Sequence, residues 1–362
     1  MTRIRNLMQN GVDDGVFPGG VLLAAKQGRI EFLEAFGRAR LTPERLMTTE
    51  TVFDLASLTK PLATTVCMMV LVQEGRVALD QTLGRSIPDF SDTDKKGITV
   101  GQLLCHTSGL PDYRPYYEAL RKWLPSERKG EVRKMLLGEA LIHEPGKACL
   151  YSDPGFMILE WLIEVVSEKP LDRFVQESVY DPLRLKDLFF IPLNGAKHRD
   201  HRLYAATEHC PWRGKILEGE VHDDNAYTLG GVAGHAGLFG TAKDVYGLLR
   251  ELLNAYLEES NTGVFHEDLV HSFFQRHSDV GTWALGFDTP TRPDSSSGQY
   301  FSDQSVGHLG FTGTSFWMDL EKGVIVILLT NRIHPTRENE KIRVFRPVVH
   351  DAVMNAIGRR GI

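Results

Sequence analysis

Apolar and alternating runs near both ends of the chain predict two β-hairpins. The runs lie at 21–25 and 30–36 near the start, and at 315–320 and 324–330 near the end. The first pair is joined at Gln27-Gly28 and the second at Glu321-Lys322-Gly323, where glycine supplies the positive φ of a tight turn. Residues 283–287 form one more candidate strand.

Between these hairpins the apolar residues recur at the spacing of amphipathic helices. The predicted helices span 62–74, 114–124, 130–141, 156–166 and 171–179. Strands at both ends with helices between them indicate that the ends build one antiparallel sheet and that the helical block is an insertion. We therefore expect an α/β (α+β) fold, with a sheet domain formed by 1–60 and 230–362 and a mainly helical domain formed by 61–229.

Charge and composition narrow the class of protein. The 362 residues suffice to bury a large core. The net charge of −6 shows no excess of basic residues that would favour binding to nucleic acid or to an anionic membrane. Residues 1–15 are mixed polar and lack the apolar stretch of a signal peptide or transmembrane span, so we expect a cytoplasmic protein. The cysteines form no C-x-x-C pair and are expected to be reduced thiols: Cys67, Cys105, Cys149 and Cys210.

Ser57-Leu58-Thr59-Lys60 places a hydroxyl and an amine three residues apart at the start of a long apolar stretch. Positions i and i+3 share one face of a helix, so the two side chains can meet without help from the rest of the fold. A serine hydroxyl is a poor nucleophile until a base takes its proton, and a lysine at a helix start can act as that base. Pro61 then falls in the first turn, where its missing N–H costs nothing.

Three further motifs follow in order along the chain. They are His106-Thr107-Ser108-Gly109-Leu110-Pro111, Tyr151-Ser152-Asp153 and His308-Leu309-Gly310. With the Ser57 motif they resemble the serine β-lactamase and penicillin-binding-protein superfamily, in its class C and esterase-like branch, whose signatures are S-x-x-K, Y-x-N and K-T-G or H-x-G. The resemblance covers nearly the whole chain and implies an active site in the cleft between the sheet and an all-α region.

The resemblance also implies a role for each catalytic residue. Ser57 is the nucleophile, and its own N–H, together with that of Phe311, binds the oxyanion of the transition state. Lys60 is the base that deprotonates Ser57, with its pKa lowered by burial. Tyr151 passes the proton to the leaving group or activates the deacylating water.

Asp153 and His308 depart from the usual family pattern. Asp153 stands where Asn is usual, and it is expected to hold Lys60 by a charge-assisted bond that raises the lysine pKa against the effect of burial. His308 stands where β-lactamases carry Lys, and because imidazole is mostly neutral at pH 7 it offers a substrate carboxylate only a fractional cation. Weak or absent β-lactamase activity follows. Gly310, two residues along the same strand, is expected to let the strand approach the acyl group closely.

We therefore expect a serine hydrolase that forms an acyl-enzyme on a small-molecule ester, amide or peptide-like substrate. A true β-lactamase or a D-Ala-D-Ala carboxypeptidase stays open among the enzymes, and an inactive binding or assembly protein stays open outside them. The segments 210–214, 219–226 and 233–237 look like those of amidases that recycle cell-wall muropeptides, which adds a muropeptide to the candidate substrates.

No cofactor or metal is expected. His266 and His271 are five residues apart and miss a common helix face, so they do not match a zinc motif. The histidines and carboxylates between His222 and His235 fit a loop network beside the cleft better than a metal site. The natural substrate, the oligomeric state and the role of this loop stay open.

Overall fold

The computed structural model describes residues 1–193, 202–260 and 262–358. Its main sheet has six antiparallel strands in the order β3-β2-β1-β11-β10-β9. Their bounds are β1 Gly19–Lys26, β2 Arg29–Arg40, β3 Arg45–Leu46, β9 Ser305–Leu309, β10 Ser315–Asp319 and β11 Val324–Thr330. β1 pairs with β11, so the two ends of the chain meet at the centre of the sheet. The predicted antiparallel sheet of an α/β fold is confirmed.

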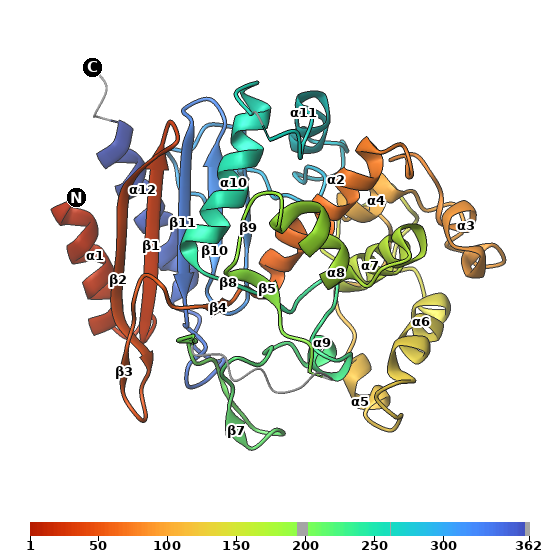
Figure 1. Ribbon diagram of the computed structural model, residues 1–362, viewed down its shortest axis with the longest axis horizontal. Helices are drawn as coiled ribbons and strands as arrows, with labels where there is room; N and C mark the ends of the chain where they lie inside the picture. Colours follow the sequence, from red (N-terminus) through yellow and green to blue (C-terminus); the bar gives the residue numbers. More distant parts are fainter. Residues whose placement is uncertain (194–201, 261, 359–362) are drawn as a thin grey trace.

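Helices cover both faces of this sheet, because its strands present apolar side chains alternately to either side. The covering helices are α1 (Thr2–Asp13) and α12 (Ile342–Gly358) on one face and α10 (Ala242–Tyr256) on the other. Leu22 and Trp317 pack in the core cluster that includes α1 and α12. Leu23 and Phe316 face the larger cluster, which includes α10 and the helices beyond it. In Figure 1, α1 lies at the left, the strands follow to its right with α12 behind them and α10 in front of β10, and both termini lie at the left.

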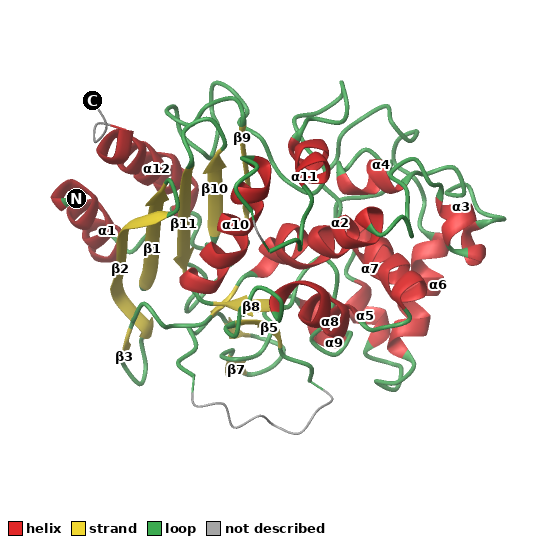
Figure 2. Cartoon of the chain, turned by 45° about the horizontal axis from the view of Figure 1, so that its top comes forward, coloured by secondary structure: helices red, strands yellow, loops and turns green. Residues whose placement is uncertain are grey.

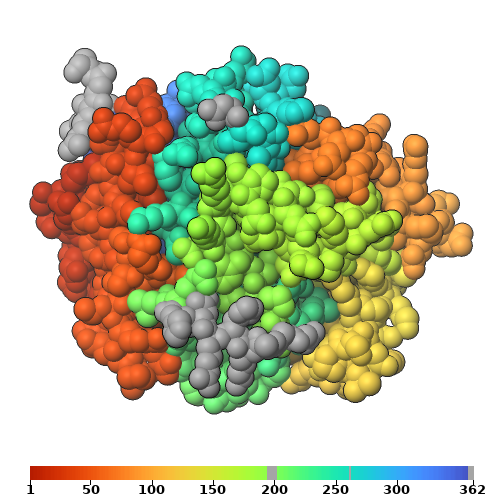
Figure 3. Space-filling view, viewed as in Figure 1, coloured from red at the N-terminus to blue at the C-terminus, as the bar shows by residue number. Residues whose placement is uncertain are grey.

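The remaining helices lie beyond α10, as the red ribbons of Figure 2 show. They are α2 Val66–Gln73, α3 Leu83–Ser86, α4 Val100–Leu104, α5 Tyr116–Leu120, α6 Arg128–Gly138, α7 Asp153–Ser167, α8 Leu171–Val175, α9 Asp224–Thr228 and α11 Glu267–Phe274. α7 is apolar around most of its circumference and packs against α2, α4, α6 and α8. In the space-filling view, green residues of this region cover the centre of the molecule, and orange and yellow residues cover its right side (Figure 3). The exact domain boundaries stay a prediction.

Two small sheets complete the described fold. β4 (Phe53–Asp54) and β5 (Leu188–Phe190) flank β8 (Leu238–Gly240), and β6 (His209–Cys210) pairs with β7 (Lys215–Ile216). The first of these sheets matters for function, because β4 ends three residues before Ser57. It thereby anchors the segment that carries the proposed nucleophile.

Several predicted elements differ in the structure. Residues 283–287 are a loop and not a strand, because only Ala284 forms an isolated bridge and Gly286 adopts a φ of +81°. The helix predicted at 114–124 is only α5, which starts after Pro115. The helix predicted at 171–179 continues from α8 into a π-helical turn, Gln176–Tyr180.

The apolar segment 56–73 is long enough and apolar enough to cross a membrane by composition alone. In this fold 83% of the segment is buried inside the protein. It is the central helix of the larger core cluster, which accounts for its apolar character without a bilayer.

Candidate active site

The turn that carries Ser57 is strained at the residue before it. Ala56 has a φ of +48°, an unfavourable value for a residue with a side chain. The buried Asp54 carboxylate stabilises this conformation, because its Oδ1 accepts the Ala56 N–H at 2.9 Å. Ser57 follows in a single 3₁₀ turn, Ala56–Leu58, and then a π-helical turn, Lys60–Thr65, leads into α2. The predicted helix therefore begins earlier and less regularly than the apolar pattern indicates.

The buried Lys60 ammonium has an acceptor for each of its three protons. Its Nζ lies 2.7 Å from Asp153 Oδ1, 3.2 Å from the His235 carbonyl oxygen and 3.3 Å from Ser57 Oγ. The contact with Ser57 confirms that the i, i+3 spacing brings these two side chains together. Asp153, at the first position of α7, points its carboxylate at Lys60 as the sequence predicts.

The protonation state of Lys60 corrects one prediction. Burial alone lowers the pKa of Lys60, but the nearby Asp153 charge and the hydrogen bonds raise it more, and the net pKa is above its ordinary value. Burial also raises the pKa of Tyr151, and the Lys60 cation offsets this only in part. At neutral pH the resting site therefore holds an ammonium and a phenol. The expected fall in the Lys60 pKa is wrong, because Asp153 and Tyr151 together outweigh desolvation, the largest single effect.

Tyr151 is held in place by the HTSGLP turn. The Leu150 N–H donates to the His106 carbonyl at 2.9 Å, and the Ser152 N–H donates to His106 Nδ1 at 3.0 Å. The His106 ring also packs on the Tyr151 ring, with centroids 4.6 Å apart. Sequence reasoning recognised the turn but missed this contact, because nothing in the motif itself indicates which loop it supports.

The end of β9 supplies the opposite wall of the site. Gly310 approaches the Ser57 segment so closely that an added Cβ would lie 2.7 Å from the Leu55 carbonyl oxygen and nearer still to Thr314. Among the described residues, the N–H groups of Ser57 and Phe311 have no hydrogen-bond partner. Both donors are therefore available to an incoming oxyanion, and their role in binding it stays a prediction of the family resemblance.

His308 is neutral. Its Nδ1 lies 2.8 Å from the Leu309 carbonyl oxygen, which can only accept, so the proton is assigned to Nδ1 and Nε2 carries a lone pair. Burial and the Lys60 charge lower the pKa of His308 to about 3. The sequence predicts that His308 is partly protonated near pH 7, whereas in the structure it is neutral at that pH. Buried Nε2 has no partner among the described residues and is an acceptor beside Tyr151.

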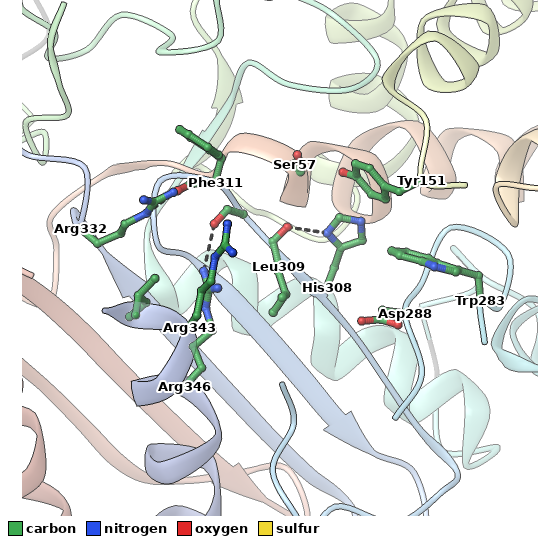
Figure 4. A pocket seen from close by; sticks show the side chains of 12 residues that line it. Ser57, Tyr151, Trp283, Asp288, His308, Leu309, Phe311, Arg332, Arg343 and Arg346 are labelled. Carbon is green, nitrogen blue, oxygen red and sulfur yellow. Dashed lines mark hydrogen bonds between the residues drawn. The ribbon is translucent and has the colours of Figure 1, made fainter. Parts of the chain in front are cut away.

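These groups share a cavity of ≈ 370 Å³ (Figure 4). Besides Ser57, Tyr151 and the end of β9, its lining includes two residues that sequence reasoning did not single out, Trp283 and Asp288. Trp283 packs against Tyr151 and His308, with ring centroids 5.6 and 5.4 Å away. Burial raises the pKa of Asp288 to about 7. The apolar pattern of residues 283–287 predicts a strand and gives no indication that Trp283 lines a cavity.

Three arginines line the other side of the cavity, namely Arg332, Arg343 and Arg346. Arg332 and Arg346 are buried, and within the described residues they donate only to backbone carbonyls. Arg343 is exposed and pairs with Glu340 at 2.7 Å. Burial and the two neighbouring guanidinium groups lower the pKa of Arg346 to about 9. We call Arg332, Arg343 and Arg346 the arginine corner. Because these three cations repel one another, an anion bound among them would be stabilised.

The other sequence candidates have structural roles. His271 packs on Tyr256, and His266 lies at the start of α11. No group of three or more His, Cys, Asp or Glu side chains in the described ranges is arranged to hold a metal ion. All four cysteines are free thiols.

Comparison with known proteins places this site in a family. A model described as Beta-lactamase matches residues 4–348. A protein of Escherichia coli (strain K12) named "Putative D-alanyl-D-alanine carboxypeptidase" is 33% identical over 365 residues, which cover 91% of this chain and 82% of that protein. A protein of the same name from Salmonella typhimurium is 33% identical over 373 residues, covering 94% of this chain and 84% of its own.

Two solved structures share the fold at lower identity. EstCE1, described as a hydrolase with promiscuous acyltransferase activity, superposes with a TM-score of 0.73 at 22% identity and covers 96% of this chain and 98% of its own. The octameric penicillin-binding protein homologue from Pyrococcus abyssi superposes with a TM-score of 0.77 at 19% identity, covering 99% of this chain and 77% of its own.

Proposed function

This chain belongs to the beta-lactamase family of serine hydrolases, and we propose that it cleaves peptides at an amide bond next to a free C-terminal carboxylate. The observation that carries the proposal is the arginine corner in the same cavity as Ser57. An amide beside a carboxylate is also the bond that the name of the E. coli relative describes. Peptides ending in D-Ala-D-Ala, including muropeptides, are therefore the first substrates to test.

The arginine corner supplies the anchor that His308 cannot. A neutral His308 offers no charge to a carboxylate, whereas Arg343 is a permanent cation. Its ion pair with Glu340 is exposed and therefore weak, so a substrate carboxylate can replace Glu340 as its partner. Buried Arg346 supports the wall itself, because it donates to the carbonyls of Gly310 and Thr314 at 3.0 Å. We assign carboxylate binding to Arg343 and wall support to Arg346. Weak β-lactamase activity stays a prediction, now dependent on whether this corner accepts a β-lactam carboxylate.

The chemistry proceeds through an ester on Ser57. Ser57 Oγ attacks the scissile carbonyl carbon, and the N–H groups of Ser57 and Phe311 bind the resulting oxyanion. The Ser57 proton passes to the Lys60–Tyr151 pair and from there to the leaving nitrogen, so the C–N bond breaks as the amine departs. Water then attacks the ester, returns the hydroxyl to Ser57 and releases the shortened peptide acid.

The carboxylate assignment is tested by comparing a peptide acid with the matching peptide amide. In the wild type the acid should be cleaved faster, and Arg343→Ala should lower kcat/KM for the acid about tenfold, the worth of one partly exposed charge-assisted hydrogen bond. The amide should change little. Arg29→Ala removes an exposed arginine outside the cavity and is the control. Equal loss on both substrates would assign Arg343 a structural role, and no cleavage of either would refute the peptide substrate.

The resting ammonium of Lys60 predicts the pH dependence. Because the pKa values of Lys60 and Tyr151 are both raised, the form with one proton fewer, which can accept the Ser57 proton, is populated at alkaline pH. We expect kcat/KM to rise with pH above neutrality. Asp153→Asn removes a charge that raises the Lys60 pKa, so the rise of kcat/KM with pH should begin about one pH unit lower, or more. A rise that begins at the same pH would show that Lys60 is not the titrating group.

A further inference from the structure

The segment from His222 to His235 contacts the catalytic groups through two separate chains of hydrogen bonds. One begins at Asp223, whose Oδ1 lies 3.0 Å from His235 Nε2. The His235 ring is buried, and Asp223 is only partly exposed. Burial lowers the pKa of His235, but the Asp223 charge and hydrogen bond raise it more, so the two side chains attract each other strongly.

This attraction places a backbone acceptor at the catalytic lysine. The His235 carbonyl oxygen accepts a hydrogen bond from Lys60 Nζ at 3.2 Å. The preceding residue is clamped on both sides, because the Gly234 N–H donates to Glu160 at 2.9 Å and the Gly234 carbonyl accepts from Thr64 at 2.6 Å. Asp223 therefore helps to hold His235, whose carbonyl oxygen faces Lys60 Nζ.

The second chain begins one residue earlier and leads to the nucleophile. The His222 N–H donates to Asp54 Oδ2 at 2.7 Å, and the other oxygen of Asp54 holds the Ala56 N–H. Ala56 is the residue with a φ of +48° directly before Ser57. The His222 ring also stacks under Phe311, the second oxyanion donor, with centroids 5.7 Å apart.

We propose that His222-Asp223 is the positioning element of the active site: through His235 it fixes the orientation of Lys60, and through Asp54 it fixes the turn that presents Ser57. The inference rests on the proposed acyl transfer by Ser57 and Lys60, but not on any particular substrate. Asp223 touches no reacting atom, so its effect on the reaction is exerted through the His235 carbonyl.

A purely structural role for Asp223 is the alternative to exclude. Its Oδ1 also accepts the Ala226 N–H at 2.7 Å and so caps the short helix α9. Its neighbour Asp224 provides the matched control, because Asp224 is equally well bonded, to Arg213 and Trp212, but has no contact with His235 or Lys60. Loss of either carboxylate should loosen the loop, whereas only the loss of Asp223 should disturb Lys60.

The test measures the inactivation of Ser57 by a fluorophosphonate, which separates the maximal rate kinact from the binding constant KI without a known substrate. Asp223→Ala should lower kinact about 10-fold to 100-fold, the usual cost of a misplaced catalytic group, with KI unchanged. Asp223→Asn keeps an acceptor oxygen and should restore most of the rate. His235→Ala should match Asp223→Ala, and the double variant should be no worse, because the two remove one hydrogen bond.

Each outcome separates the inference from the proposed function. An unlabelled wild type would refute the serine nucleophile and the positioning role that depends on it. A labelled wild type that leaves peptide acids intact would refute the substrate alone. Equal kinact for the wild type and Asp223→Ala, or an equal fall for Asp224→Ala and Asp223→Ala, would overturn the inference. If Asp223→Ala does not fold, His235→Ala provides the comparison, because it keeps the cap of α9.

Discussion

Replacing Ser57 by alanine should abolish turnover while leaving the protein folded. The Ser57 hydroxyl makes a 3.3 Å hydrogen bond with Lys60 Nζ and a further hydrogen bond with Tyr151, and the loss of these contacts costs the folded state little. The reaction, in contrast, loses the atom that forms the acyl-enzyme. We expect kcat to fall by about 10⁴-fold or more, as in other enzymes that lose a serine nucleophile.

The measurement combines hydrolysis of p-nitrophenyl acetate with fluorophosphonate labelling and a thermal unfolding curve. Ser57→Ala should lose both hydrolysis and labelling and keep its melting temperature within a few degrees. Ser126→Ala, at an exposed position, is the control and should keep all three. Hydrolysis by Ser57→Ala at the wild-type rate would refute the mechanism. A wild type that never labels would instead favour the inactive binding or assembly protein.

The parts of this site that the sequence predicts are those set by local geometry. The i, i+3 spacing alone brings Ser57 to Lys60, because any helical turn places those positions on one face. The two terminal hairpins, β1–β2 and β10–β11, follow in the same way from alternation around glycine turns. The family pattern supplied the long-range partners Tyr151 and His308, which lie far from Ser57 in the sequence but line one cavity with it.

What the sequence could not predict depends on distances between distant segments. Burial lowers the Lys60 pKa, and the Asp153 carboxylate at 2.7 Å raises it together with Tyr151. The sequence indicates the effects of burial and of Asp153 but not that the net pKa is raised. The arginine corner was missed because its members come from the loop after β11 and from two turns of α12. Arg343 and Arg346 are three apart on one helix, but nothing local indicates that this helix borders the cavity.

The second large effect is expected from Lys60 and Tyr151, the pair proposed to transfer the Ser57 proton. Lys60→Met keeps most of the buried aliphatic volume and removes the ammonium, and Tyr151→Phe removes only the hydroxyl. Each should lower kcat/KM by about 10²-fold to 10⁴-fold, the usual contribution of a positioned acid–base group. Tyr116→Phe removes a hydroxyl that bonds Glu139 outside the cavity, so this matched control should leave kcat/KM unchanged.

The double variant tests whether the two groups act on one proton. Lys60 Nζ lies 4.7 Å from the Tyr151 ring centre, and Lys60 and Ser57 both influence the Tyr151 pKa through hydrogen bonds, so the three groups form one connected path. Once either member is lost the path is broken, and removal of the other should cost little more. We therefore expect the double variant to lose far less than the product of the single losses. Losses that multiply would mean independent roles, with Tyr151 then serving a separate step such as activation of the deacylating water.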